Sequence, residues 1–151
     1  MMDQQAANIS SPNGLSQEET QQVIDIMMSF FTKETGSKKK AVQYINSIGN
    51  LIKNPAAKLI HLDGVVFLVL VKDRGVVEFH TMATKQSSSD FIKKVNMLAD
   101  VLRNMGVTKM YSYSNDNKFK ILAKRSRKPW VITKKTGADG VVYDVYTLEL
   151  K

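Results

Sequence analysis

The sequence predicts an α+β fold built on a mixed β-sheet, and three observations lead to this prediction. Apolar residues recur at helical spacing before Pro55, whereas from Ala57 onward they form the shorter runs that are typical of strands. Two of these runs are joined only by the turn Asp63-Gly64, which indicates an antiparallel hairpin. A later pair of strand-like runs is separated by a helical pattern, and a crossover helix is the usual link between parallel strands.

Two helices are predicted before the sheet. Ser16 is a favourable N-cap with Glu19 three residues later, and the apolar stripe that follows continues to Phe31. A second amphipathic segment begins after Gly36 and stops at Asn54-Pro55, because the residue before a proline is biased away from the helical conformation.

The sheet is predicted to begin as an antiparallel meander and to end in a hairpin. The strand from Val76 and the strand from Lys109 are expected to lie parallel and adjacent, and to splay apart beyond His80 and Tyr111. In chain order, the predicted elements are a strand pair over 58–70, a strand over 76–84, a helix over 89–105, a strand over 109–114, a short helix over 119–123, and strands over 130–133 and 141–150.

The first fifteen residues differ in composition from the rest of the chain. Residues 1–15 are rich in Gln, Asn, Ser and Ala and contain the turn Pro12-Asn13-Gly14, a composition that cannot form a core of its own. We therefore predict a polar tail over 1–15, which contacts another chain or packs without regular secondary structure, and a single domain over 16–151.

Composition excludes several kinds of site. The chain has no cysteine, which rules out disulfides, thiolate zinc sites and cysteine nucleophiles. His61 and His80 are the only histidines, so no metal site is expected. No apolar stretch has the length of a membrane span, and a cytosolic or intracellular assembly context is expected.

The formal charge of +8 is unevenly distributed. Residues 1–35 carry a net charge of −4 and the remainder +12, with the highest density of basic residues between Lys118 and Lys135. Such a segment attracts nucleic acid, a phosphorylated cofactor or an acidic protein surface. A solvated helix face is the alternative interpretation, and the charge alone does not decide among them.

The order of the predicted elements resembles that of the GNAT acyltransferase superfamily over residues 16–150. The segments 63–84 and 143–150, with the run Glu78-x-His80-Thr81, are similar to GNAT-fold proteins of tailed bacteriophages, among them an internal virion protein of short-tailed coliphages. This resemblance implies a mixed sheet with two N-terminal helices, an antiparallel meander, a central helix, and then a strand, a helix and a hairpin.

The resemblance also implies a site for acetyl-CoA at the start of the central helix. GNAT enzymes hold the cofactor pyrophosphate there with a glycine-bearing loop, and the helix N-terminus favours the negative charge. The matching positions here contain serine and no glycine, and with Asp90 they also fit a plain helix cap. The cofactor-binding residues that the resemblance implies are Thr81, Thr84, Gln86, Ser87, Ser88, Ser89 and Asn115.

Three residues are candidates for catalysis. Glu78 and His80 are two residues apart on a predicted strand, so their side chains share a face, where either is a candidate general base. The tyrosine that serves the family as a general acid is replaced by Leu122, so Tyr113 is the candidate proton donor, with Tyr111 or Ser114 as alternatives. A surface Glu–His pair and ordinary packing of the two tyrosines are the alternatives.

Two functions follow from the resemblance. The first is a virion-associated structural or assembly component, located in the virion or the host cytoplasm, that binds other virion proteins or copies of itself through its N-terminal tail and basic helix. The alternative is an acetyl-CoA-dependent N-acetyltransferase. Nucleic-acid binding through Lys118–Lys135, with Trp130, Tyr111 and Tyr113 as stacking surfaces, is a third hypothesis and lacks a recognised motif.

Overall fold

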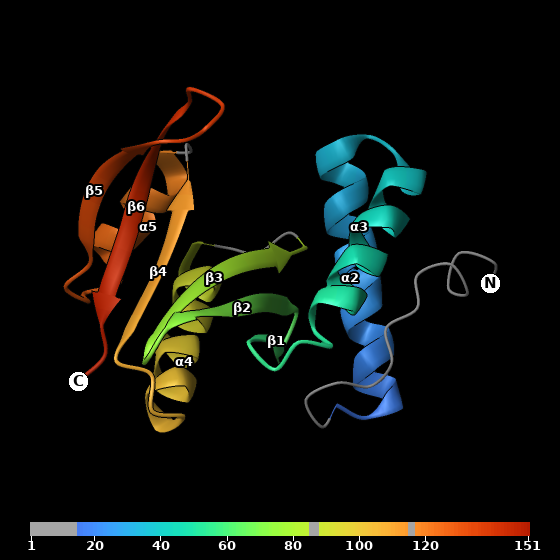
Figure 1. Cartoon of the computed structure of the whole chain (residues 1–151), viewed down its shortest axis with the longest axis horizontal. Helices are drawn as coiled ribbons and strands as arrows, with labels where there is room; N and C mark the ends of the chain where they lie inside the picture. The colour runs from blue at the N-terminus through green and yellow to red at the C-terminus, as the bar shows by residue number, and fades with distance from the viewer. Residues whose placement is uncertain (1–14, 85–87, 115–116) are drawn as a thin grey trace. The chain divides into compact units, whose positions relative to one another are not determined.

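The computed structural model of the chain describes residues 15–84, 88–114 and 117–151 (Figure 1). Its elements follow the predicted α+β order. They are α2 (Gln17–Thr35), α3 (Lys38–Leu51), β1 (Ala57–Leu62), β2 (Val65–Asp73), β3 (Val76–Ala83), α4 (Ser88–Asn104), β4 (Lys109–Ser114), α5 (Asn117–Arg125), β5 (Val131–Thr136) and β6 (Val142–Glu149).

The six strands form a mixed sheet in the order β1-β2-β3-β4-β6-β5. Strands β1 and β2 are antiparallel, as the turn at Asp63-Gly64 predicts. Strands β3 and β4 are parallel, which confirms the prediction made from the crossover helix. Strand β6 lies between β4 and β5 and is antiparallel to both.

The chain divides into two compact units. The first contains the described residues up to 70 together with 80–84, and the second contains 71–79 and the described residues from 88 onward. The single domain predicted over 16–151 stays a prediction. Within the described ranges, no helix is both long enough and apolar enough to cross a membrane.

The first unit is organised by its two helices. Ser16 Oγ accepts a hydrogen bond from the backbone N–H of Glu19 at 3.1 Å, which confirms the predicted N-cap of α2. Leu15 packs against the buried cluster of this unit. That cluster consists of Val23, Ile24, Met27, Ile45, Ile48, Ile52, Ala57, Leu59, Val66, Leu68 and Met82.

In the second unit, one face of β4 and β6 is buried by helix α5. Met110 and Tyr146 are fully buried, and the Phe119 ring of α5 lies with its centroid 4.5 Å from that of Tyr146. Because side chains alternate along a strand, Tyr111 and Tyr113 belong to the opposite face of β4. The packing of α5 therefore decides which face of the sheet remains available for a site.

The turn at Gly75 sets the register between β3 and β4. Its φ of 72° lies in the left-handed region that favours glycine, and an added Cβ would come within 2.8 Å of Thr108 Oγ1. The Gly75 carbonyl accepts hydrogen bonds from the backbone N–H groups of Thr108 and Lys109, just before the parallel pairs begin. The recorded pairs run from Val76 opposite Lys109 to Glu78 opposite Tyr111 and end there.

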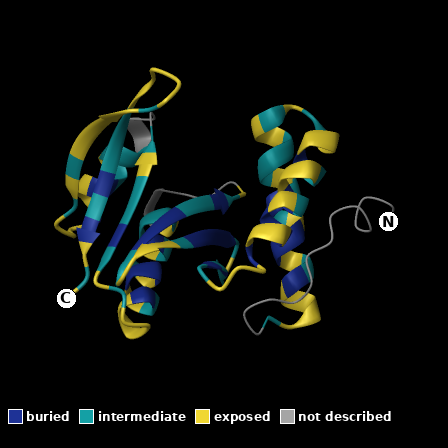
Figure 2. Cartoon of the chain, in the orientation of Figure 1, coloured by how far each residue is buried: buried dark blue, intermediate teal, exposed yellow. Residues whose placement is uncertain are grey.

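Strand β5 is at the edge of the sheet and pairs only with β6 among the described strands. It extends to Thr136, three residues beyond the predicted end at Thr133, because its lysine-rich end also pairs with β6. Apart from Ile132, its residues are exposed, as Figure 2 shows along much of the strand. Lys134 Nζ lies 3.2 Å from Asp144 Oδ1 across the hairpin.

Candidate active site

The face of β4 and β6 that α5 leaves uncovered forms one side of an open pocket of about 630 Å³. This volume lies within the range of pockets that accept small organic ligands. The pocket lies entirely within the second unit. It is lined by Glu78 of β3, Tyr111 and Tyr113 of β4, Tyr143 and Val145 of β6, and residues Lys135, Thr136, Gly137, Ala138 and Asp139 of the β5–β6 hairpin.

Glu78 is the buried carboxylate of this pocket, with 8% of its surface exposed. It lies directly opposite Tyr111 in the parallel register, and Tyr111 Oη donates a hydrogen bond to Glu78 Oε1 at 3.2 Å. Desolvation raises the pKa of Tyr111, and the nearby charge of Glu78 raises this pKa further. The phenol therefore stays protonated at neutral pH and remains a hydrogen-bond donor.

Tyr113, a predicted catalytic residue, lines the same pocket as Glu78. Its ring meets that of Tyr143 edge to face, with centroids 5.7 Å apart and an interplanar angle of 76°. Desolvation, and then the charge of Glu78, raise the pKa of the Tyr113 phenol. The structure thus brings together two of the three residues that were predicted for catalysis.

Asp139 lies in the turn of the β5–β6 hairpin. Its Oδ1 accepts the backbone N–H of Val141 at 3.0 Å, and its Oδ2 accepts the hydroxyl of Tyr143 at 2.9 Å. The pKa of Asp139 is lowered chiefly by the hydrogen bond from Val141 and next by that from Tyr143, so the carboxyl group is ionised at neutral pH. A Cβ at Gly137 would come within 2.8 Å of Asp139 Oδ1, so the missing side chain leaves room for this carboxylate.

The predicted residues at the end of β3 belong to the other unit. Glu78 falls in the second unit, whereas His80, Thr81 and Thr84 fall in the first. His80 and Thr81 are half-buried, and Thr84 is exposed. The shared Glu78–His80 site and the cofactor contacts of the two threonines stay predictions.

In the sequence, the remaining predicted cofactor residues come at the start of helix α4 and just after strand β4. Helix α4 begins at Ser88, one residue earlier than predicted, so Ser88 and Ser89 occupy its first turn. The first N–H groups of an α-helix have no carbonyl partner within that helix, so those of Ser88 and Ser89 need a hydrogen-bond acceptor from outside it. Gln86, Ser87 and Asn115 lie outside the described residues.

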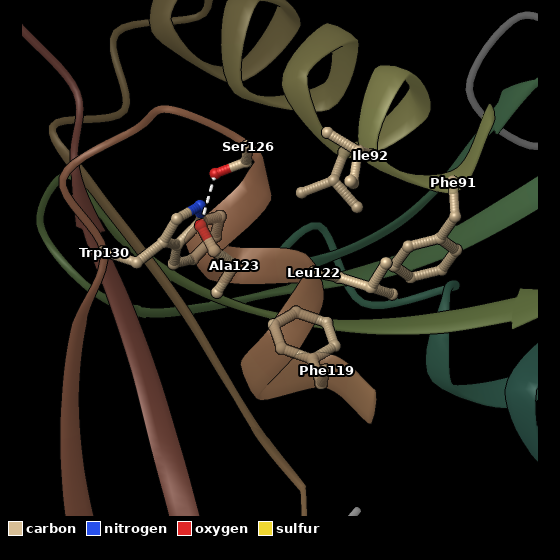
Figure 3. A pocket seen from close by; sticks show the side chains of 8 residues that line it. Phe91, Ile92, Phe119, Leu122, Ala123, Ser126 and Trp130 are labelled. Atoms are coloured by element: carbon tan, nitrogen blue, oxygen red, sulfur yellow. Dashed lines mark hydrogen bonds between the residues drawn. The ribbon is translucent and has the colours of Figure 1, made fainter. Parts of the chain in front are cut away.

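A second, much smaller pocket lies between α4 and α5 (Figure 3). Its volume of about 10 Å³ is roughly that of one water molecule. Figure 3 shows Leu122 among the apolar side chains of Phe91, Ile92 and Phe119 that line it. Leu122 therefore contributes apolar packing at the position where the resemblance to GNAT enzymes implies a tyrosine that acts as general acid.

Ser126 closes the end of α5 beside this small pocket. Its hydroxyl donates a hydrogen bond to the Ala123 carbonyl at 2.7 Å and accepts one from the backbone N–H of Lys128 at 3.3 Å. In the part of the chain that the structure describes, no group of three or more His, Cys, Asp and Glu side chains is placed to hold a metal ion.

The sequence interpretation did not single out Tyr143 and Asp139 as site residues. The sequence predicts the closing hairpin but not that it lies beside β4. Pairing between strands that are distant in the sequence leaves little signal in either strand alone. The alternation of Tyr143 with Val145 was the available signal, since both then share one face of β6.

No family model matches the sequence, and no curated protein matches it significantly. Solved structures match its fold. An aminoglycoside 6'-acetyltransferase type Ii aligns with a TM-score of 0.65 and 12% identity over 95% of this chain and 96% of that chain.

Two further structures agree with this match. A chimera of the spermidine N-acetyltransferase SpeG from Vibrio cholerae gives a TM-score of 0.62 at 9% identity, over 84% of this chain and 90% of that one. The microcin C7 self-immunity acetyltransferase MccE, solved with acetyl-CoA and AMP, gives 0.58 at 13% identity, over 87% and 82%. The chain therefore has the fold of the GNAT acetyltransferases, and at these identities the likeness shows the fold alone.

Proposed function

We propose that this protein is an acetyl-CoA-dependent N-acetyltransferase whose acceptor amine binds in the pocket of Glu78. The observation that carries the proposal is a buried carboxylate in an open pocket, hydrogen-bonded by a phenol that remains protonated. A carboxylate so placed attracts an ammonium group, orients it and accepts a proton from it. The acetyltransferase fold supplies the second reason for this choice.

The described residues fit acetyl-CoA at the start of helix α4. The N-terminus of α4 at Ser88 provides backbone N–H groups for a phosphate, although Asp90 in the first turn opposes the negative charge. The implied contacts of Thr81, Thr84, Gln86, Ser87, Ser89 and Asn115 remain part of this proposal.

When bound, acetyl-CoA supplies a thioester whose acetyl group passes to the amine nitrogen, the carbon–sulfur bond breaking with its electron pair on sulfur. The ammonium nitrogen loses two protons overall, of which one ends on the sulfur and one in solvent. Glu78 accepts the first proton and so exposes the nitrogen lone pair. Tyr113, whose raised pKa keeps it protonated, is the donor in place of the absent tyrosine at position 122.

Direct measurement of binding and transfer tests this function. Calorimetry should detect acetyl-CoA binding, and mass spectrometry should detect acetylation of a primary amine. Glu78→Gln should lower kcat/KM by roughly 100-fold or more, the usual contribution of a general base. The matched control is Glu149→Gln, which alters an exposed carboxylate of β6 that pairs with Lys109.

Two results would contradict the proposal. The first is a folded wild-type protein that neither binds acetyl-CoA nor transfers its acetyl group. The second is a folded Glu78→Gln variant that retains full activity. The virion-assembly role expected from the sequence, with its protein partners and nucleic-acid contacts, also stays a prediction.

A further inference from the structure

Two carboxylates line the proposed acceptor pocket, and they come from different ends of it. Glu78 is buried on β3, and Asp139 lies exposed in the hairpin turn beyond β5. The function proposed above uses only Glu78. Apart from its two hydrogen bonds within the hairpin, the second carboxylate has no part in that function.

The strand register gives an approximate separation between the two ends. Glu78 lies opposite Tyr111, and Tyr111 lies opposite Thr147. Tyr143, whose hydroxyl donates a hydrogen bond to Asp139, comes four residues before Thr147 on β6. Across the sheet, the two backbones are two strand spacings of about 4.8 Å apart, and along the strands they are four residues of about 3.4 Å apart. Because these two displacements are perpendicular, the backbones of Glu78 and Tyr143 are separated by roughly 17 Å. A small monoamine bound at Glu78 would leave the Asp139 end of the pocket empty.

The Asp139 end has the composition of a cation site. The rings of Tyr113 and Tyr143 meet nearly at a right angle, and the Asp139 carboxylate accepts the Tyr143 hydroxyl at 2.9 Å. Aromatic faces attract an ammonium group, and an adjacent carboxylate adds to that attraction. Each Asp139 oxygen accepts one recorded hydrogen bond, and a carboxylate oxygen can accept a second.

Lys135 is the one basic residue among those that line the pocket, and it affects any cation bound there. It lies opposite Tyr143 in the β5–β6 register and is exposed. Two carboxylates and one ammonium group leave the formal charge of the pocket negative. The lysine should weaken binding of a cation at the Asp139 end, and its removal should strengthen that binding.

We propose that the acceptor is an extended aliphatic polyamine, with one ammonium group reacting at Glu78 and a second held by Asp139 beside the Tyr143 ring. This inference rests on the proposed acetyltransferase function and adds the substrate class. It also assigns to Tyr143 and Asp139 a role in specificity, at a distance from the reacting nitrogen.

A matched substrate series tests the substrate class. Each linear alkylamine is compared with the α,ω-diamine of the same chain length, from four to ten carbons, by its kcat/KM for acetylation by the full chain. The ratio of diamine to monoamine should stay small for short chains and rise to roughly tenfold once the second ammonium group reaches Asp139 and the Tyr143 ring. A ratio near unity at every length would overturn the inference.

Two substitutions of opposite sign make the test specific. Asp139→Asn retains an oxygen for the Val141 N–H but removes the charge, and it should lower the ratio for long diamines by about fivefold, the scale of an exposed ion pair. Lys135→Gln should raise the same ratio. Asp100→Asn on α4, which alters an exposed carboxylate paired with Arg103, is the control and should leave the ratio unchanged.

Failure of this inference can be distinguished from failure of the proposed function. Acetyl transfer to amines without any preference for long diamines would refute the polyamine site alone, as would an unchanged ratio in the folded Asp139→Asn variant. If no amine is acetylated, calorimetry with 1,10-diaminodecane in the absence of acetyl-CoA still tests the site. If the diamine binds, and Asp139→Asn weakens this binding while Lys135→Gln strengthens it, the polyamine site is supported and the acetyltransferase function is refuted. If the diamine does not bind, both proposals are refuted.

Discussion

Tyr111 and Glu78 lie opposite each other on parallel strands at the point where the pairing of those strands ends. The register alone places the phenol next to the carboxylate, and the 3.2 Å hydrogen bond follows from that placement. The sequence identified Glu78 and both tyrosines as candidates but gave no reason to prefer Tyr111 as the donor to Glu78. That preference depends on which strand is the neighbour of β3, which is a property of the sheet.

The Tyr111–Glu78 pair predicts a specific dependence of stability on pH. Folding raises the pKa of Tyr111 above its usual value of 10.0, so the folded state favours the protonated phenol. Its contribution to stability is complete below about pH 10 and is lost as the pH rises through the raised pKa. Urea denaturation should therefore show the free energy of unfolding falling above about pH 10, and Tyr111→Phe should reduce this fall.

The same variant should cost about 1 kcal/mol at neutral pH, because it removes one hydrogen bond from a buried carboxylate. Tyr113 and Tyr143 also have raised pKa values, so part of the alkaline loss should remain in Tyr111→Phe. An identical pH dependence in the wild type and the variant would show that Tyr111 does not contribute.

At the scale of single elements, the helices were the most predictable part of the chain. The N-cap at Ser16 and the left-handed residue Gly36 after α2 act through contacts within one turn, so the local sequence specifies them. Strand β5 was predicted too short, because Lys134 and Lys135 are unfavourable strand signals in isolation. Their pairing with Asp144 and Tyr143 of β6 outweighs that preference.

The start of α4 offers a test of the proposed phosphate contact. Ser88→Glu places a second carboxylate near Asp90 in the first turn, where it should stabilise the helix by roughly 0.3–1 kcal/mol through the helix dipole. It should at the same time weaken acetyl-CoA binding through charge repulsion. Thermal denaturation and calorimetry on one sample would show the two opposite effects.

A control for this substitution is Ser47→Glu in α3, which adds the same charge at an exposed position of the first unit. It should leave acetyl-CoA affinity unchanged. Equal affinities for Ser88→Glu and Ser47→Glu would indicate that the start of α4 only caps a helix.

At the scale of the whole molecule, the order of elements was predictable and the composition of the pocket was not. Helix and strand patterns are local, and the turns at Asp63-Gly64 and Gly75 fix how neighbouring strands pair. The pocket depends on β6 lying between β4 and β5, which brings Tyr143 close to Tyr113 from thirty residues away. Such contacts between distant segments become visible only once the strands are arranged in a sheet.

The boundary of the N-terminal tail leads to a prediction about truncation. Leu15 packs against the core of the first unit and Ser16 caps α2, so both contribute to folding. Removing residues 1–14 should change the free energy of unfolding by less than about 0.5 kcal/mol. Removing residues 1–16 should cost roughly 1–2 kcal/mol through the lost cap and apolar contact.

Chemical denaturation of the two truncated chains checks this prediction, and their oligomeric states show whether the tail mediates association. A large loss of stability on removing residues 1–14 would mean that the tail contributes to folding. An unchanged stability after removal of residues 1–16 would mean that Leu15 and Ser16 are dispensable.

The exposed edge of β5 has a consequence for how the protein behaves at high concentration. An open edge is a template for pairing with the same edge of a second copy, and lysine side chains are a common protection against it. Antiparallel pairing of two β5 edges would bring Lys134 and Lys135 close to their counterparts in the other copy. Salt screens this repulsion, so concentrated sodium chloride should favour self-association through β5, and dilution into low salt should reverse it.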